Sequence, residues 1–169
     1  MEQLLAQIKV KRTIQMFTWN IIIIASFALI LGLLGTVMSI RMFLVRAQFQ
    51  PLPTDGLFSF FNPGLYLFPS VYHIAMSILL ILASVYVLRY NERWRKILLA
   101  ALIIEVLFLV ITPVLNISKI PNLDTALGTW GNAKTRLVIW SVIISYCLAF
   151  FFAIAAMKFS RGSVKQLFK

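Results

Sequence analysis

The sequence predicts an all-α integral membrane protein, a bundle of four transmembrane helices with both termini in the cytoplasm. Three observations support this fold class. Hydrophobic residues make up 61% of the 169 residues and charged residues only 12%, whereas soluble domains average about 45–50% and about 25%. Four stretches are long enough to cross a bilayer, and basic residues lie unevenly on the two sides of them. The composition excludes a soluble enzyme, a disordered tail and a disulfide scaffold.

A helix needs about 20 mainly apolar residues to cross the hydrocarbon of a bilayer. The predicted spans are residues 17–40, 69–88, 97–116 and 137–157. The first has no charge, and the second has Pro69 in its first turn, where a helix tolerates proline. The predicted external loops are residues 41–68 and 117–136, and a turn at residues 89–96 joins the middle spans. We therefore expect a single membrane domain over residues 1–169.

The basic residues set the expected orientation. Short loops on the cytoplasmic side of membrane proteins carry an excess of Lys and Arg. One side of the predicted spans carries eleven of the sixteen basic residues and the other carries five. The eleven belong to the N-terminal segment, the turn at residues 89–96 and the C-terminal segment, so we expect both termini in the cytoplasm. Topology thus explains the net charge of +11, and no nucleic-acid partner is expected.

The segment before the first span mixes apolar and basic residues. Leu5 and Ile8 fall near one helical face, with Lys9 and Arg12 elsewhere, which is typical of a helix lying in the cytoplasmic interface. A frayed basic tail fits the same composition equally well. In both cases we expect contacts with anionic lipid headgroups. The apolar stretch that follows is longer than a signal-peptide core and lacks an A-x-A-like site, so we expect it to be an uncleaved span.

Cysteine and histidine are too scarce for several kinds of site. Cys147 is the only cysteine and His73 the only histidine, so this chain alone builds no disulfide, no bis-histidine haem site and no HExxH zinc site. The sequence also lacks a phosphate-binding glycine loop, an acid pair and a Ser-His-Asp set. We therefore expect no enzymatic activity, no cofactor and no metal site.

Small and hydroxyl side chains recur every three or four residues in the predicted spans. Membrane helices associate through such residues, because lipid is as apolar as leucine and gives no other driving force. The residues are Gly32 and Gly35 in the first span, Ser77 and Ser84 in the second, and Ser141 and Ser145 in the fourth. These stripes predict the surfaces on which the helices pack.

Glu105 is the one ionisable residue deep inside a predicted span. A charge at that depth costs on the order of 3 kcal/mol on insertion scales. We therefore expect the carboxyl to face the bundle interior and to be protonated there, since burial disfavours the charged form. Counting residues from the span ends places five hydroxyl groups at the same depth, those of Ser26, Ser77, Ser84, Ser145 and Tyr146.

Three roles for Glu105 remain open. In a proton or cation relay, Glu105 is the titratable site, and Thr112 and Asn116 continue the path outward on the same helix face. In a packing role, neutral Glu105 donates one interhelical hydrogen bond. In the third, it meets a basic group or a lipid contributed by a partner subunit. A relay normally needs more than one titratable station, and the predicted spans offer none besides Glu105.

His73 lies within about the first turn of the second predicted span, at the outer interface and near Tyr72 and Tyr66. Histidine titrates near neutral pH, which allows a ligand-binding or pH-sensing role. A side chain that simply reaches interfacial water is the favoured interpretation.

The first external loop is rich in aromatic residues and proline. Phe58, Phe60 and Phe61 lie in it, between Pro53 and Pro63. Such a segment either lies among the headgroups as an aromatic belt or packs on a partner, since exposed aromatic patches commonly mark contact sites. We expect these three residues to be interfacial and available to a neighbouring chain.

Taken together, the sequence favours a non-enzymatic multi-pass subunit that packs in a homo-oligomer or a larger complex of the plasma membrane. Its expected partners are anionic lipids and other membrane chains or copies of itself. The alternative is a small proton- or ion-conducting component built around Glu105.

Overall fold

The computed structural model describes residues 2–48, 63–117 and 133–168. The elements in chain order are α1 (Glu2–Gln48), α2 (Pro63–Leu88), α3 (Glu92–Ile117), α5 (Ala133–Ser160), the one-turn α6 (Gly162–Lys165) and the 3-10 turn η2 (Gln166–Phe168). Four helices are long and apolar enough to cross a membrane, at Gln7–Arg41, Leu67–Leu88, Glu92–Val114 and Ile139–Ser160. The all-α class and the four membrane-length helices are therefore confirmed.

The helices are longer than the predicted spans and continue into parts of residues 41–68 and 117–136, which were predicted as external loops. α1 continues to Gln48, and α2 begins at Pro63. Pro63 takes the first helical position, where its missing N–H costs nothing, and Pro69 lies inside the helix, contrary to the prediction. Surrounding apolar residues favour continuing the helix through Pro69, because backbone groups in a membrane are best satisfied within a helix.

α1 is one continuous helix of 47 residues, which is about 70 Å long at 1.5 Å per residue. The N-terminal segment is therefore neither a separate interfacial helix nor a frayed tail but the first part of α1. The sequence contains no proline before Pro51 to interrupt it. The hydroxyls of Thr13, Thr18 and Thr36 each donate a hydrogen bond to the carbonyl oxygen four residues earlier and leave the helix intact.

Only residues 89–91 connect α2 to α3, a tighter turn than predicted. The N–H of Tyr90 donates to the Val87 carbonyl and that of Asn91 to the Tyr86 carbonyl, the pattern of a Schellman helix end. Tyr90 takes the left-handed position, with φ of 56°, which glycine usually fills. The Asn91 side chain then accepts the N–H groups of Arg93 and Trp94 as the N-cap of α3.

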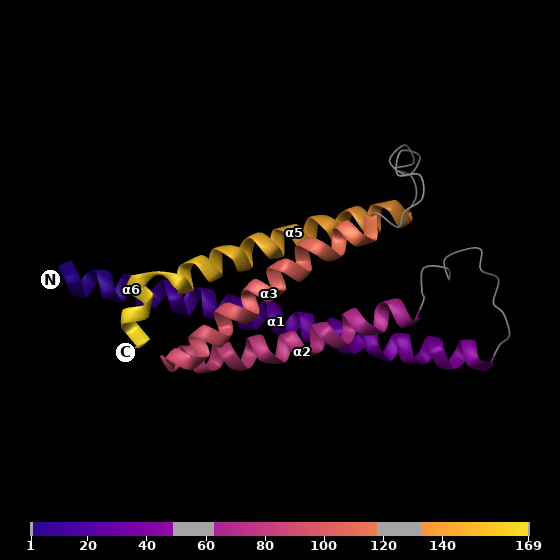
Figure 1. Cartoon of the computed structure of the whole chain (residues 1–169), viewed down its shortest axis with the longest axis horizontal. Helices are drawn as coiled ribbons and strands as arrows, with labels where there is room; N and C mark the ends of the chain where they lie inside the picture. The colour runs from indigo at the N-terminus through magenta and orange to yellow at the C-terminus, as the bar shows by residue number, and fades with distance from the viewer. Residues whose placement is uncertain (1, 49–62, 118–132, 169) are drawn as a thin grey trace.

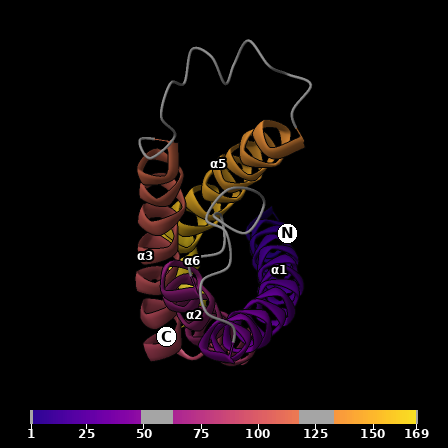
Figure 2. The same ribbon diagram turned by 90° about the vertical axis from the view of Figure 1, so that its right-hand side faces the viewer.

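The four long helices form two hairpins that share one packed end. α1 packs along α2, and α3 packs along α5, while α3 also contacts α2 near the turn (Figure 1). The two hairpins diverge toward the end that carries the two long connections, as the view along the molecule also shows (Figure 2). Both termini lie at the packed end (Figure 1). α1 and α5 consequently make little contact with each other.

The hydrophobic core lies at the packed end. It joins Ile21 of α1, Val87 of α2, Leu98 and Leu102 of α3, and Phe159 of α5, all almost fully buried. The C-terminal turns α6 and η2 close this end, because the side chains of Val164 and Phe168 are also buried in the core.

A buried arginine links three elements at the same end. Arg95 is 4% exposed, and its Nη1 donates a 2.8 Å hydrogen bond to the carbonyl oxygen of Phe159, in the last turn of α5. Its Nε and Nη2 both donate to the carboxylate of Glu92 at 2.6 Å, and the guanidinium lies 5.8 Å from the ring centre of Phe168. A cation at the end of α5 satisfies a carbonyl that the helix leaves unpaired.

Candidate functional site

The candidate site is a group of four side chains between α2 and α3, here called the Glu105 cluster. It consists of Tyr72 and His73 on α2 with Glu105 and Phe108 on α3. The Tyr72 hydroxyl donates a 3.0 Å hydrogen bond to Oε2 of Glu105. Nδ1 of His73 lies 3.8 Å from Oε1 of the same carboxyl. The two oxygens of Glu105 therefore face two different polar groups.

Phe108 holds the two rings of α2 in place. It stacks on Tyr72 with ring centres 3.9 Å apart and an interplanar angle of 22°. It also meets His73 edge to face, with centres 5.3 Å apart and an angle of 89°. Aromatic pairs in these geometries add about 0.5–1.5 kcal/mol beyond the area that they bury. The rings thus fix the positions of the phenol and the imidazole relative to the carboxyl.

The two titratable side chains of the cluster, Glu105 and His73, differ in how deeply they are buried. The side chain of Glu105 is 8% exposed and that of His73 is 33% exposed. Glu105 lies three residues, or about one turn, beyond the fully buried Leu102. The imidazole is therefore the more exposed of the two groups.

The expected hydrogen-bond partners of Glu105 need correction. Glu105 bonds to Tyr72, which was not among the hydroxyls expected at its depth. His73 was predicted at the outer interface, and its Nδ1 lies 3.8 Å from Oε1 of Glu105. It is the eleventh residue of a helix that begins at Pro63, about 15 Å along its axis, and its position relative to the membrane stays a prediction.

This geometry suits the storage and exchange of one proton. A carboxyl and an imidazole lie 3.8 Å apart, and each is a side chain that can bind and release a proton. The phenol of Tyr72 is a donor to Oε2, which leaves Oε1 as the oxygen that faces the imidazole. The cluster offers hydrogen-bond donors and acceptors, and its four residues supply no cysteine or serine nucleophile.

The other polar residues predicted for the site lie elsewhere on α2, α3 and α5 and do not belong to the Glu105 cluster. Thr112 is half-buried on α3, about 10 Å farther along the axis than Glu105. Ser77 and Ser84 are buried on α2, and the Ser84 hydroxyl has no hydrogen-bond partner in the described part of the chain. On α5, Ser141 is exposed and Ser145 is half-buried.

Some predicted residues lie outside the described part of the chain. The side chain of Asn116 and the three phenylalanines Phe58, Phe60 and Phe61 belong to this group. A continuation of the polar path through Asn116 and a contact surface on the first long connection therefore stay predictions.

The glycines of α1 lie where α2 approaches most closely. A Cβ atom on Gly32 would lie 2.9 Å from Cγ1 of Ile74 and 3.2 Å from the carbonyl oxygen of Ser70. A Cβ on Gly35 would lie 2.7 Å from Oγ of Ser70. All three distances are shorter than ordinary contacts, so both positions accommodate only glycine without a shift.

Three residues with structural roles were not predicted from the sequence: Tyr72, Phe108 and Arg95. A usable signal was present for the first two. Tyr72 and Phe108 each lie eighteen residues from Tyr90, and the two arms of a tight antiparallel hairpin rise equally from its turn. Pairing residues at equal distances before and after the turn would thus have placed these two rings side by side. The burial of Arg95 has no such signal, because its acceptor carbonyl belongs to α5.

Among the described residues, no group of three or more His, Cys, Asp and Glu side chains lies close enough to hold a metal ion. Comparison of the chain with models of protein families, with curated protein sequences and with solved structures finds no match.

Proposed function

We propose that this chain is a non-enzymatic multi-pass membrane subunit that packs against further membrane chains, or copies of itself, as a structural or accessory component. The observation that carries this proposal is the position of Tyr146. It lies near the middle of α5, about 20 Å from either helix end, and its side chain is 41% exposed.

The Tyr146 hydroxyl has no hydrogen-bond partner within the described residues. The hydrocarbon core of a bilayer contains no water to replace one, and an unsatisfied polar group there costs several kcal/mol. Tyrosines that face lipid usually lie at the interface, where the hydroxyl reaches water. An acceptor on a neighbouring transmembrane helix would satisfy this hydroxyl.

The open arrangement of the hairpins supports the same proposal. The apolar windows of α1 and α5 are each 17% buried within the chain, compared with 33% for α2 and α3. The exposed side chains beside Tyr146 include Ile143 and Phe150, one turn away on either side. α5 therefore presents an uninterrupted surface on which a partner helix can pack around the phenol.

Substitution of Tyr146 by Phe tests this proposal, because it removes only the hydroxyl. We expect the variant to insert normally and to lose the larger complex in mild detergent, measured by mass photometry or native electrophoresis. Tyr86→Phe is the matched control, since Tyr86 lies at the packed end and stacks on Trp94 at 4.6 Å. Complexes of equal size and stability for wild type and Tyr146→Phe would contradict the proposed contact.

Cys147 offers an independent readout. It is the only cysteine in the sequence and it is exposed beside Tyr146. If α5 packs on a partner, maleimide labelling of Cys147 in the assembled complex should be slower than in the dissociated chain. Equal labelling rates in the two states would place the partner elsewhere.

The first long connection offers a second contact for partners. Phe58, Phe60 and Phe61 are proposed to pack on a neighbouring chain or among lipid headgroups. Replacing all three by Ala should reduce recovery of the complex while the monomer still inserts. Unchanged recovery would remove this connection from the partner surface.

The proposed location is the plasma membrane, with both termini cytoplasmic and the basic end in contact with anionic lipids. The distribution of eleven basic residues on one side and five on the other supports this orientation. A C-terminal fluorescent protein that matures only in the cytoplasm should be bright, and a C-terminal periplasmic reporter enzyme should be inactive. The opposite pair of results would reverse the orientation.

A second candidate function is a proton- or ion-conducting component built around Glu105. The observation in its favour is the 3.8 Å approach of His73 to Glu105, which supplies the second titratable group that the sequence did not place beside the carboxyl. In reconstituted vesicles, Glu105→Gln and His73→Gln should each abolish proton flux. Tyr72→Phe, which keeps both titratable groups, should retain most of it. Wild-type flux in Glu105→Gln would reject the conducting role.

A further inference from the structure

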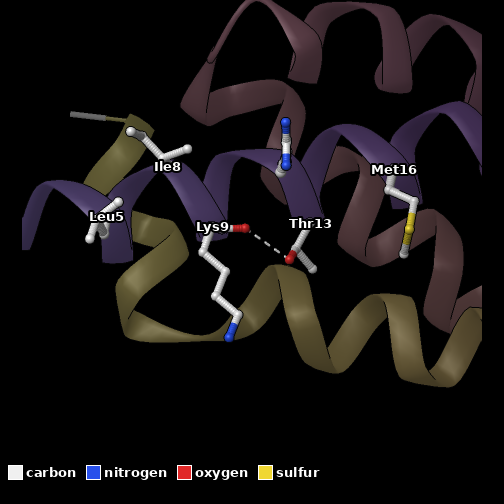
Figure 3. A pocket seen from close by; sticks show the side chains of 6 residues that line it. Leu5, Ile8, Lys9, Thr13 and Met16 are labelled. Atoms are coloured by element: carbon white, nitrogen blue, oxygen red, sulfur yellow. Dashed lines mark hydrogen bonds between the residues drawn. The ribbon is translucent and has the colours of Figure 1, made fainter. Parts of the chain in front are cut away.

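A groove of about 410 Å³ runs along the N-terminal part of α1 (Figure 3). Its lining side chains follow the three- and four-residue spacing of a single helix face. They are Leu5, Ile8, Lys9, Arg12, Thr13 and Met16. The groove thus combines two basic side chains with apolar side chains on both sides of them along the helix.

The positive charge of the groove is not compensated by the described part of the chain. Neither Lys9 nor Arg12 forms an ion pair with a described residue. The C-terminal ribbon passes beside this part of α1 (Figure 3), and α6, which contacts α1, brings a further cation at Lys165. Glu92, whose side chain is described at this end of the bundle, is already bonded twice to Arg95.

The groove lies at the level of the turn between α2 and α3. Lys11, between the two basic residues of the groove, has its Nζ 5.2 Å from the ring centre of Tyr90 in the α2–α3 turn. Toward the membrane, the same face of α1 continues as a row of exposed apolar side chains. These are Met16, Trp19, Ile23, Phe27 and Ile30, each more than half exposed.

We propose that this groove binds the phosphate group of an anionic phospholipid. Lys9 and Arg12 contact the phosphate oxygens, and an acyl chain follows the apolar row from Met16 toward Ile30. One face of a single helix lines the groove, so the groove is an open surface that contacts a headgroup from one side and does not enclose a whole lipid. The Thr13 hydroxyl already donates to the Lys9 carbonyl at 2.9 Å, so the two cations are the main phosphate ligands.

This inference makes the proposed anionic-lipid partner specific to one site, and it does not depend on the contact at Tyr146. The test is native mass spectrometry of the full chain in mild detergent, with phosphatidylglycerol or phosphatidylcholine added. Lys9→Gln is the test variant. Lys11→Gln is the matched control, because it makes the same change of charge two residues away, on the side of α1 that meets Tyr90.

We expect one phosphatidylglycerol to remain bound under conditions that remove phosphatidylcholine. Lys9→Gln and Arg12→Gln should each weaken its retention about fivefold, which is the effect of about 1 kcal/mol per basic side chain near an anionic surface. Lys11→Gln should retain it as wild type does.

Three results would overturn the site. Equal weakening by Lys9→Gln and Lys11→Gln would indicate a diffuse effect of charge. Equal retention of the two lipids would mean that the site does not distinguish an anionic phospholipid from a zwitterionic one. Displacement of the lipid by millimolar inorganic phosphate would identify a site for a free anion instead. The thermal unfolding midpoint of each variant, expected to equal that of wild type, shows that folding is unchanged.

Discussion

The hydroxyl of Tyr72 on α2 donates a 3.0 Å hydrogen bond to the carboxyl of Glu105 on α3, 33 residues later in the chain. This bond joins α2 to α3 through the buried Glu105 and the partly buried Tyr72. It also fixes one oxygen of the carboxyl and leaves the other facing His73. The stability of the α2–α3 interface therefore depends on this contact, which also leaves Oε1 of Glu105 directed at His73.

Tyr72→Phe should destabilise the protein by about 1–3 kcal/mol, because it leaves a buried carboxyl oxygen without its donor. Phe keeps the stacking on Phe108, so the loss reports the hydrogen bond. The measurement is reversible unfolding in mixed micelles. Tyr86→Phe is the control and should change stability by much less, since Tyr86 stacks on Trp94 at 4.6 Å near the turn. Equal losses in the two variants would contradict the role of the bond.

Gly32→Ala should destabilise the α1–α2 hairpin by about 1–3 kcal/mol, the usual cost of inserting a methyl group into a packed interface. The new Cβ would lie 3.2 Å from the backbone oxygen of Ser70, and backbone moves only with its helix. Gly162→Ala is the control, because nothing lies within 4 Å of its added Cβ. The measurement is the unfolding midpoint of each variant at equal detergent concentration. An unchanged midpoint for Gly32→Ala would show that α1 and α2 move apart at this position without loss of stability.

A disulfide should form between cysteines introduced at Gly35 and Ser70. The Cβ position of Gly35 is 3.6 Å from Cβ of Ser70, within the range of about 3.5–4.5 Å that disulfides require. Replacing Cys147 by Ser removes the native thiol. Under mild oxidation the double variant should lose two hydrogens by intact-mass measurement and block maleimide labelling.

The control for this pair combines Gly35→Cys with Ser77→Cys, since Ser77 lies seven residues, about 10 Å, farther along α2. It should remain reduced under the same oxidation. Equal oxidation of both pairs would mean that α1 slides along α2 and that the observed register is not unique.

Arg95→Met should loosen the C-terminal turns. The variant loses the bond from Nη1 to the Phe159 carbonyl, and a hydrogen bond from a charged donor contributes about 1.5–3 kcal/mol. Hydrogen exchange of residues 161–168 should become faster, while the amides of α2 stay protected. Arg93→Met is the control, because Arg93 is exposed and forms no ion pair within the described residues. Unchanged exchange in Arg95→Met would show that the core alone holds these turns.

Much of the fold could be predicted from the sequence, because the four membrane-length helices depend on local composition. A run such as Ile21–Ile24 has no alternative to a helix in a bilayer. The helix ends were less predictable. Pro69 suggested a helix start, and Pro63 six residues earlier is the actual one. Both positions satisfy the local preference of proline, and the choice depends on whether the intervening residues find contacts that keep them helical.

The Glu105 cluster shows the same division. The sequence alone showed that Glu105 is the one ionisable residue deep inside a predicted span, that glycines occur at Gly32 and Gly35, and that basic residues gather on one side of the predicted spans. Only the tertiary structure decided that Tyr72 and His73 are the neighbours of Glu105 and that Arg95 is buried against α5. Composition and periodicity are local properties of one helix. The partner of a side chain depends on the register and rotation of two helices, and these are set by close packing across the whole interface.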